Sequence, residues 1–332
     1  MVGEFLILLV LITAAAALLS YGAEIFAEKF GAHFTGSVVL ALITTMPEYM
    51  FVIWAAIKFE YSMAIGSAVG ACTILITLGY GLVILFATSR ISKRPVERIE
   101  LSAGTRIDAI YLMVTAIVAL LLAWEGGGYD LKDGILLTLL FVIYVIQLSR
   151  RAFIFARNNN THADAPKPTG KRLAVASGFL LVGGLAVFFL SEPFVDSMLK
   201  LAHGLGINPM AIAIILGPFA SEMPEKITAY ITVIRNGRLA EISVCNFIGS
   251  KVNHNSLLLG TLPLVAFFKN HGTVPGIISL PFLTMTVLTI FATISLARRR
   301  LTRGQGVLFV LLYAAIIFAA YMVRTPVVAS PH

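Results

Sequence analysis

Residues 44–48 read Thr-Thr-Met-Pro-Glu and residues 221–225 read Ser-Glu-Met-Pro-Glu, and each stands in the middle of a long apolar stretch. A glycine-containing motif follows each of them, at residues 66–71 in the first half of the chain and at residues 245–250 in the second. A single Met-Pro-Glu triplet would carry little information. The same triplet in the second apolar stretch of each half, followed by a related motif, indicates an internal duplication.

The composition around these motifs is that of a membrane protein. Of the 332 residues, 58% are hydrophobic and only 13% are charged, and the mean hydropathy is +0.90. A soluble domain carries about 25% charged residues, so the hydrocarbon of a bilayer is the natural solvent for this chain. The net charge of +8 would suggest nucleic acid as a partner for a soluble protein. Here we expect no nucleic-acid partner, because most of the basic residues lie in loops between apolar stretches, where Lys and Arg mark the cytoplasmic side of a membrane protein.

The fold class we predict is an all-α polytopic membrane protein. A membrane-spanning helix needs about 20 mostly apolar residues, and ten stretches qualify. We also expect residues 191–206 to extend the sixth of them rather than to form another span. The ten predicted spans are residues 2–28, 36–57, 62–88, 107–124, 133–153, 173–194, 209–234, 240–268, 274–297 and 306–322.

A polar stretch at residues 156–172 divides the spans into two groups of five. We therefore predict a first five-helix repeat at 1–155, a linker at 156–172 and a second five-helix repeat at 173–332. Because each repeat has an odd number of spans, the second must be inverted relative to the first, as in inverted-repeat transporters. Most of the 25 basic residues fall in loops on one side of this arrangement. The positive-inside rule then places the linker in the cytoplasm and both termini outside.

The duplicated motif contains the residues that would form a site. An ionisable group at bilayer depth is costly and marks function by default, which singles out Glu48 and Glu225. Pro47 and Pro224 remove a backbone donor and interrupt their helices, which frees carbonyl groups nearby. Symmetry would bring the two acids together, and calcium takes six to eight such oxygen ligands. The hydroxyls that would complete the oxygen-rich cluster belong to Thr44, Thr45 and Ser221.

Other polar residues in these spans leave alternatives open. Glu222 has no counterpart in the first half, and an ion pair with Lys226 at i,i+4 is as good an expectation for it as a ligand role. His254 is more often a packing histidine than a ligand, although a proton-relay role stays open. Asn246 is expected either to line the cavity or only to bridge helices.

These residues resemble the cation/calcium exchanger superfamily, which includes sodium/calcium and proton/calcium exchangers. The resemblance covers nearly the whole chain, with ten spans, a central cytoplasmic loop and two alpha-repeats. It implies that Glu48 and Glu225 bind the transported cation, helped by Thr44 and Ser221. It adds further candidates for the cavity or for proton coupling, namely Thr45, Glu222, Asn246, Ser250 and His254.

The chain departs from sodium-coupled members of that superfamily. The positions at which those members carry sodium ligands or their neighbours hold Ala71 and Leu75 in the first half. In the second half they hold Ser250 and His254, and Lys251 replaces the last asparagine of the motif. Most of the side chains that serve as sodium ligands in those members are therefore missing, which favours protons as the coupling ion.

The predicted function is a membrane antiporter that exchanges calcium, or a related divalent cation, for protons by alternating access. The protein would hold no resident cofactor, its transported ions would be Ca²⁺ and H⁺ or Na⁺, and its surroundings would be inorganic cations and the bilayer. Sodium-coupled exchange on the same scaffold is the first alternative. A membrane-embedded enzyme that uses the two acids as general acid and base is a distant one, because no nucleophile or phosphate-binding motif is present.

Overall fold

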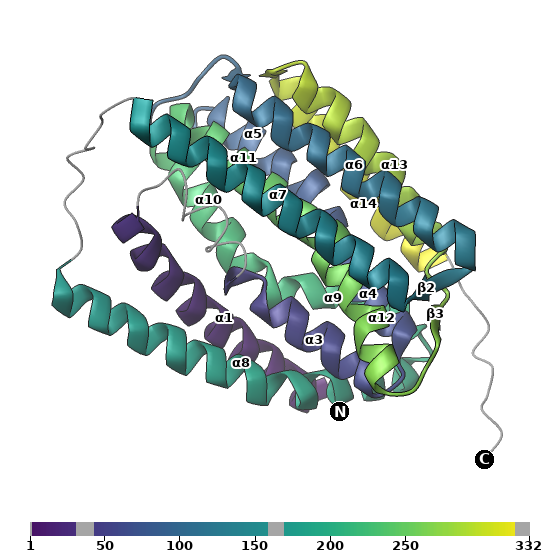
Figure 1. The fold of residues 1–332 in the computed structure, drawn as a ribbon. Coiled ribbons are helices and arrows are strands. Elements are labelled where there is room, and N and C mark those ends of the chain that lie inside the picture. Colours follow the sequence, from purple (N-terminus) through teal and green to yellow (C-terminus); the bar gives the residue numbers. More distant parts are fainter. Residues whose placement is uncertain (1, 31–42, 159–168, 323–332) are drawn as a thin grey trace.

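The computed structural model describes residues 2–30, 43–158 and 169–322, apart from a few side chains within the helices, and it is mostly helical (Figure 1). The described helices of the first half are α1 (Val2–Phe30), α3 (Met46–Ile57), α4 (Tyr61–Ile74), the π-helix η1 (Leu75–Gly79), α5 (Tyr80–Ala87), α6 (Ala103–Gly126) and α7 (Leu131–Asn158). Those of the second half are α8 (Gly170–Leu205), α9 (Pro209–Ser221), α10 (Met223–Arg235), the 3-10 helix η2 (Gly237–Leu239), α11 (Ala240–Asn253), the π-helix η3 (His254–Leu258), α12 (Leu259–Phe268), α13 (Leu280–Ala297) and α14 (Arg303–Met322).

Four short strands join α6 and α13 at both ends. β1 (Ile99–Glu100) precedes α6 and pairs antiparallel with β4 (Arg300–Leu301), which follows α13. β2 (Gly128–Asp130) follows α6 and pairs antiparallel with β3 (Thr273–Pro275), which precedes α13. The two helices therefore run antiparallel and pack along each other.

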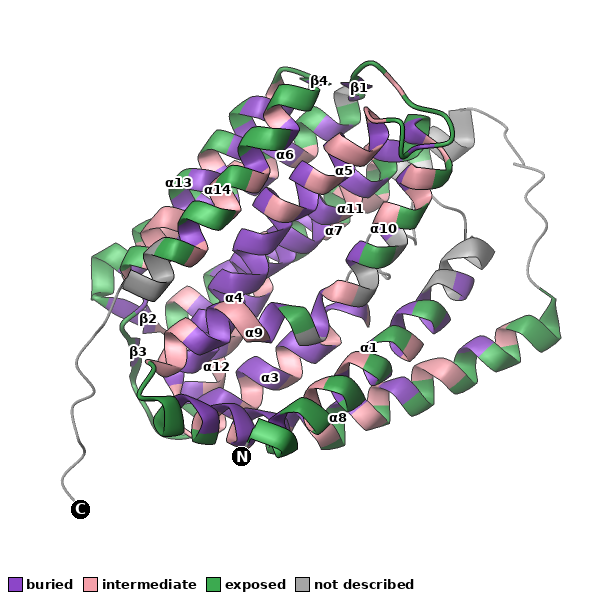
Figure 2. Cartoon of the chain, turned by 180° about the vertical axis from the view of Figure 1, so that it is seen from behind, coloured by how far each residue is buried: buried purple, intermediate pink, exposed green. Residues whose placement is uncertain are grey.

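Six described helical segments are long and apolar enough to cross a membrane, and α3, α9 and α14 contain shorter apolar helices. Many large apolar side chains are exposed on the outer helices, among them Leu121 on α6, Phe189 on α8 and Val287 on α13. Figure 2 shows buried residues concentrated on the inner helices and exposed ones on the outside. Apolar groups that face outward around a packed interior are what a protein surrounded by lipid requires.

Several predicted span boundaries match the helices. Helix is continuous over residues 61–87 and over residues 240–268, and α8 runs on to Leu205 as expected for the extended sixth span. α13, which corresponds to the ninth predicted span, begins later than predicted, at Leu280, because residues 273–275 pair as a strand. The second predicted span lies partly outside the described residues. Residues 159–168 of the predicted linker also lie outside the described residues. The ends of the linker that are described mostly belong to helices, because α7 runs to Asn158 and α8 begins at Gly170.

The basic loops predicted on one side of the membrane gather at one end of the molecule. The loop after α5 meets the end of α10, where the amide of Lys93 donates to the carbonyl of Ile234 at 2.8 Å. The same loop leads into β1, whose partner β4 lies beside the arginines of residues 298–303. Near the end of α7, Arg151 pairs with Asp108 at the start of α6, at 2.7 Å. The loops that carry most of the basic residues in the sequence therefore also lie close together in the folded molecule.

The interior is built around two kinked central segments. The first comprises α4, η1 and α5, the second α11, η3 and α12, and each contains one π-helix just after its glycine-containing motif. Almost every residue of α4 is buried. Gly66 and Gly70 of α4 lie directly against the backbone of Met210 and Ile214 of α9, so a side chain at either glycine would push the two helices apart. This close packing places α9, and the chain break that ends it, at the centre of the molecule.

Candidate functional site: two buried carboxylates and an imidazole

Two helix breaks position the candidate site. Helical structure is interrupted at Thr45, just before α3, and at Glu222, between α9 and α10. Pro47 and Pro224 occupy the first turns of α3 and α10, where a missing N–H is tolerated but where a continuous helix could not run through. The breaks predicted from the two Met-Pro-Glu triplets are thus present, and the first of them places Glu48 in the opening turn of α3.

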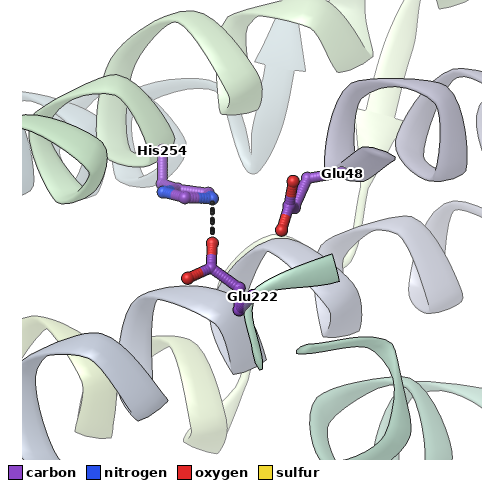
Figure 3. A group of neighbouring side chains, drawn as sticks. All are labelled: Glu48, Glu222 and His254. Carbon is purple, nitrogen blue, oxygen red and sulfur yellow. Dashed lines mark ion pairs between the residues drawn. The ribbon is translucent and has the colours of Figure 1, made fainter. Parts of the chain in front are cut away.

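Three buried side chains from different parts of the chain converge at these breaks (Figure 3). They are Glu48 of α3, Glu222 between α9 and α10, and His254 at the start of η3. Their exposed fractions are 1%, 1% and 0%. Each offers one ligand atom, and these three atoms all lie within 4.8 Å of one another. Such a group of carboxylate and imidazole donors can hold a metal ion.

The two oxygens of Glu222 have different partners. Oε2 accepts a hydrogen bond from the Lys226 ammonium at 2.6 Å, and Oε1 lies 3.2 Å from Nε2 of His254. Lys226 is itself fully buried, so its ion pair with Glu222 is shielded from water. The ion pair expected at i,i+4 is therefore present, and the same carboxylate also faces the cluster.

His254 is held in one orientation by its own helix. Its Nδ1 lies 2.6 Å from the backbone carbonyl of Ser250. A carbonyl oxygen can only accept a hydrogen bond, so Nδ1 carries the proton and donates it. Nε2 is therefore the nitrogen that faces Glu222 and Glu48. The sequence favoured a packing role for this histidine and left a proton-relay role open, and the structure places it in the cluster.

Glu48 differs from Glu222 in its surroundings. Among the described residues, neither of its carboxylate oxygens has a hydrogen-bond partner, although the side chain is almost completely buried. A buried carboxylate without partners is strongly disfavoured. A bound cation or a bound proton would remove that cost, which makes Glu48 the clearest candidate ligand of the site.

A polar layer surrounds the cluster and holds the helices around it. The Asn253 amide donates to Oγ1 of Thr45 at 2.9 Å, and its Oδ1 accepts from the Tyr49 hydroxyl at 2.5 Å. These contacts join α11 to the break before α3. Nearby, Lys251 donates to Oδ1 of Asn255 at 2.8 Å, so this second buried ammonium is held by an amide rather than by a carboxylate of the cluster.

The other residues predicted from the sequence are placed as follows. Thr44 and Ser221 are buried next to the two breaks, and the Ser221 hydroxyl donates to the carbonyl of Gly217 at 3.2 Å. Asn246 is half-buried on α11, one turn before the buried Ser250. The side chain of Glu225 lies outside the described residues, so its pairing with Glu48 stays a prediction. Glu222 and His254, given lesser weight from the sequence, are the residues that the structure brings to Glu48.

An all-α bundle in which broken helices meet at buried carboxylates defines a multi-pass membrane transporter. The family model described as sodium/calcium exchanger protein matches the chain twice, at residues 2–149 and at residues 175–322. The chain belongs to this sodium/calcium exchanger protein family. Its family and its structural neighbours are exchangers rather than enzymes.

Individual relatives support the same family and fold. An uncharacterised membrane protein of Methanocaldococcus jannaschii is 25% identical over 330 residues, which cover 97% of this chain and 98% of the relative. The crystal structure of an H⁺/Ca²⁺ exchanger superposes with a TM-score of 0.76 at 20% identity, over 96% of this chain and 86% of that one. A sodium-calcium exchanger superposes with a TM-score of 0.67 at 23% identity, over 98% of both chains. At these identities the two structures show the shared fold.

Proposed function

We propose that this chain exchanges calcium, or a related divalent cation, for protons by alternating access. The observation that carries the proposal is Glu48, a buried carboxylate without a hydrogen-bond partner among the described residues, which faces Glu222 and His254 across two helix breaks. A dication bound there would be stabilised by the carboxylates. When the cation leaves, protons would take its place and keep the buried site close to neutral.

The residues around the cluster favour protons over sodium as the coupling ion. Ala71 and Leu75 occupy positions where the resemblance places sodium ligands or their neighbours, and both are fully buried apolar side chains. In the second half the corresponding region carries His254 and, close to it in sequence, the buried ammonium of Lys251. Neither an apolar nor an ammonium side chain can coordinate sodium, which takes oxygen ligands. Ser250 keeps its hydroxyl at one of these positions, but most of the donors of a sodium site of the usual kind are missing.

The proposed ligand set joins the cluster to the residues given by the resemblance. Glu48 and Glu225 would bind the cation, with hydroxyls of Thr44 and Ser221 on the two helices that the breaks interrupt. The proposed scaffold is two inverted five-helix repeats with both termini outside and the linker in the cytoplasm. It is supported by the two matches of the family model and by the gathering of basic loops at one end.

A flux experiment on the purified protein in liposomes tests this function. Uptake of radioactive calcium is measured against an outward proton gradient or an outward sodium gradient, with the membrane voltage clamped. We expect the proton gradient alone to drive uptake and an outward sodium gradient at equal pH to drive none. Uptake driven by sodium alone would overturn proton coupling. If neither gradient drives uptake of calcium or of any other divalent ion tried, the function itself is wrong.

A further inference from the structure

The chemistry of the cluster indicates which divalent ions it selects. We propose that Glu48, Glu222 and His254 bind a borderline transition-metal dication, such as Zn²⁺, Fe²⁺ or Co²⁺, with Nε2 of His254 as a direct ligand. The inference rests on the proposed exchange of a divalent cation, and it names the class of ion that the exchange site prefers. It follows from the donor atoms, from their orientation and from the two buried lysine side chains near the site, Lys226 and Lys251.

His254 has the arrangement of a metal-binding histidine. Histidines that bind metals almost always donate their other ring N–H to a carbonyl or carboxylate, which sets the tautomer and aims the lone pair. In this chain Nδ1 donates to the Ser250 carbonyl at 2.6 Å. Nε2 faces Oε1 of Glu222 at 3.2 Å; it donates to that oxygen when the ring is protonated, and its lone pair is free for a metal when the ring is neutral. A metal ion bound between these two atoms would take the place of the ring proton and bond to both.

The separation of these atoms suits a small transition-metal ion. Zinc bonds to nitrogen and carboxylate oxygen are about 2.0–2.2 Å long, so two ligands of a tetrahedral site lie roughly 3.3 Å apart. The 3.2 Å between Nε2 of His254 and Oε1 of Glu222 matches this spacing. Glu48 supplies the third ligand atom, within 4.8 Å of the other two. Three protein ligands leave a coordination position for water, which would allow the ion to enter and to leave.

Lys226 supports this arrangement rather than competing with it. It binds Oε2 of Glu222 at 2.6 Å and leaves Oε1 directed at the cluster. Carboxylates that ligate metals are commonly held by a hydrogen bond of this kind. Lys226 is therefore a positioning residue for Glu222, and its ammonium need not move for a metal to bind at Oε1.

The same features disfavour calcium. Calcium takes six to eight oxygen ligands, so it would need oxygens beyond Glu48 and Glu222, such as those of Glu225, Thr44 and Ser221, and it gains nothing from the imidazole nitrogen. Lys226 and Lys251 are fully buried ammonium groups close to the site, and they weaken its attraction for any dication. A transition metal recovers that loss through its bond to the imidazole, a ligand that suits zinc, iron and copper. Calcium, whose bonds are mainly electrostatic, cannot.

The first test uses the unmodified protein in detergent, loaded with Zn²⁺. X-ray absorption at the zinc edge should show an imidazole nitrogen in the first shell, at about 2.0–2.1 Å, together with scattering from the rest of the ring. Titration should show Zn²⁺ and Co²⁺ bound at least roughly tenfold more tightly than Ca²⁺, because imidazole suits transition metals whereas carboxylate and carbonyl oxygens suit calcium. A zinc shell of oxygens alone, or calcium bound more tightly than zinc, would overturn the proposal.

Variants show whether the ion sits in the cluster. We expect His254→Gln to weaken Zn²⁺ binding by roughly 100-fold, at or above the upper end of the loss seen when only a group supporting a ligand is removed. Ca²⁺ binding should change far less. His203→Gln is the matched control, because His203 is exposed at the end of α8 and is not among the clustered residues. Equal zinc binding by His254→Gln and the wild type would overturn the assignment.

The outcomes separate this inference from the proposed function. Proton-driven calcium uptake without zinc binding would leave the function intact and refute the inference. Zinc bound through His254 without proton-driven transport of any divalent ion would support the site and refute the function. Zinc binding accompanied by proton-driven zinc uptake, with both lost in His254→Gln, would support the two together.

Discussion

Glu48 and Glu222 are carboxylates of the same cluster, yet their neighbours give them different roles. Glu222 is held by Lys226 on one oxygen and faces His254 with the other. Glu48 has no hydrogen-bond partner among the described residues. The negative charge of Glu222 is therefore balanced by the protein itself, whereas that of Glu48 needs an ion or a proton from outside. We expect substitutions at the two positions to separate stability from transport.

Replacing Glu48 by glutamine should abolish transport while leaving the fold intact. The amide has nearly the same shape but cannot supply the charge that the dication needs, so we expect initial uptake to fall at least roughly 100-fold, equivalent to about 2.7 kcal/mol. Glu60→Gln is the control, since Glu60 is half-buried at the start of α4 and makes no capping hydrogen bond. Uptake by Glu48→Gln at the wild-type rate would remove Glu48 from the site.

Lys226→Met should act mainly on stability. Removing one partner of a buried ion pair leaves the other charge uncompensated, at a cost of roughly 3–5 kcal/mol. Thermal unfolding in detergent should therefore show a clearly lower midpoint for Lys226→Met. The double variant Lys226→Met with Glu222→Gln should recover much of that loss, because no uncompensated charge remains. Additive effects of the two changes would mean that the pair contributes little to the folded state.

The residues of the site were predictable to different degrees. Glu48 followed from its place beside a proline at membrane depth, because a carboxylate there is too costly to be kept without a function. The Glu222–Lys226 ion pair followed from i,i+4 spacing as one of two alternatives. His254 was only one of several further candidates, because a single histidine on an apolar helix is usually a packing residue. The signal for it was the resemblance to sodium-coupled exchangers, which placed it where those members carry a sodium ligand or a neighbour of one.

At the level of elements, the two π-helices are the feature that sequence periodicity could not reveal. η1 and η3 occur in corresponding places in the two halves, and each widens one turn of an otherwise α-helical segment. A π-helical turn shifts the residues after it around the helix axis, so a face assigned with 3.6 residues per turn is wrong beyond it. His254 begins η3. The directions of Asn255 and of the residues after it therefore depend on a local geometry that no pattern of apolar residues encodes.

The packing of α4 on α9 gives a prediction at this scale. A methyl group at Gly70 would overlap the backbone carbonyl of Ile214, which cannot move without shifting α9 and the break at its end. We expect Gly70→Ala to destabilise the protein by about 1–3 kcal/mol, as other overpacked cores do, and to slow transport. Gly178→Ala on α8, where nothing lies within 4 Å, is the control and should change stability by less than about 1 kcal/mol. Unfolding midpoints and uptake rates for both variants check this.

At the level of the whole molecule, charge and hydropathy were sufficient to predict a polytopic helical protein and the end at which its basic loops gather. They could not give the exact helix starts. Residues 274–279, for example, are apolar enough to be counted in a span, but the strand pairing of β3 with β2 and the loop after it take them out of the helix. Pairing between residues far apart in the chain leaves no trace in a local window, which is why this boundary was misplaced.

The proposed orientation can be tested by labelling. In a variant lacking Cys72 and Cys245, a single cysteine is introduced at exposed Glu97, among the basic loops, or at exposed Gly272, at the opposite end. A membrane-impermeant maleimide applied to intact cells should label Gly272→Cys and leave Glu97→Cys unlabelled until the membrane is opened. The reverse pattern would place the basic loops outside and contradict the positive-inside assignment.

The two strand pairs at the ends of α6 and α13 restrict how the exchanger can change shape. One strand pair, β1–β4, joins α6 to α13 at one end, and the other, β2–β3, joins them at the opposite end. Separating the two helices, or sliding one along the other, would break backbone hydrogen bonds in these pairs. We expect the two helices to move together as one frame. α1 and α8 pack along each other on one flank of the bundle (Figure 1), and no described strand ties either of them to the frame. Opening to alternate sides of the membrane would then be a matter of this helix pair shifting against a rigid frame.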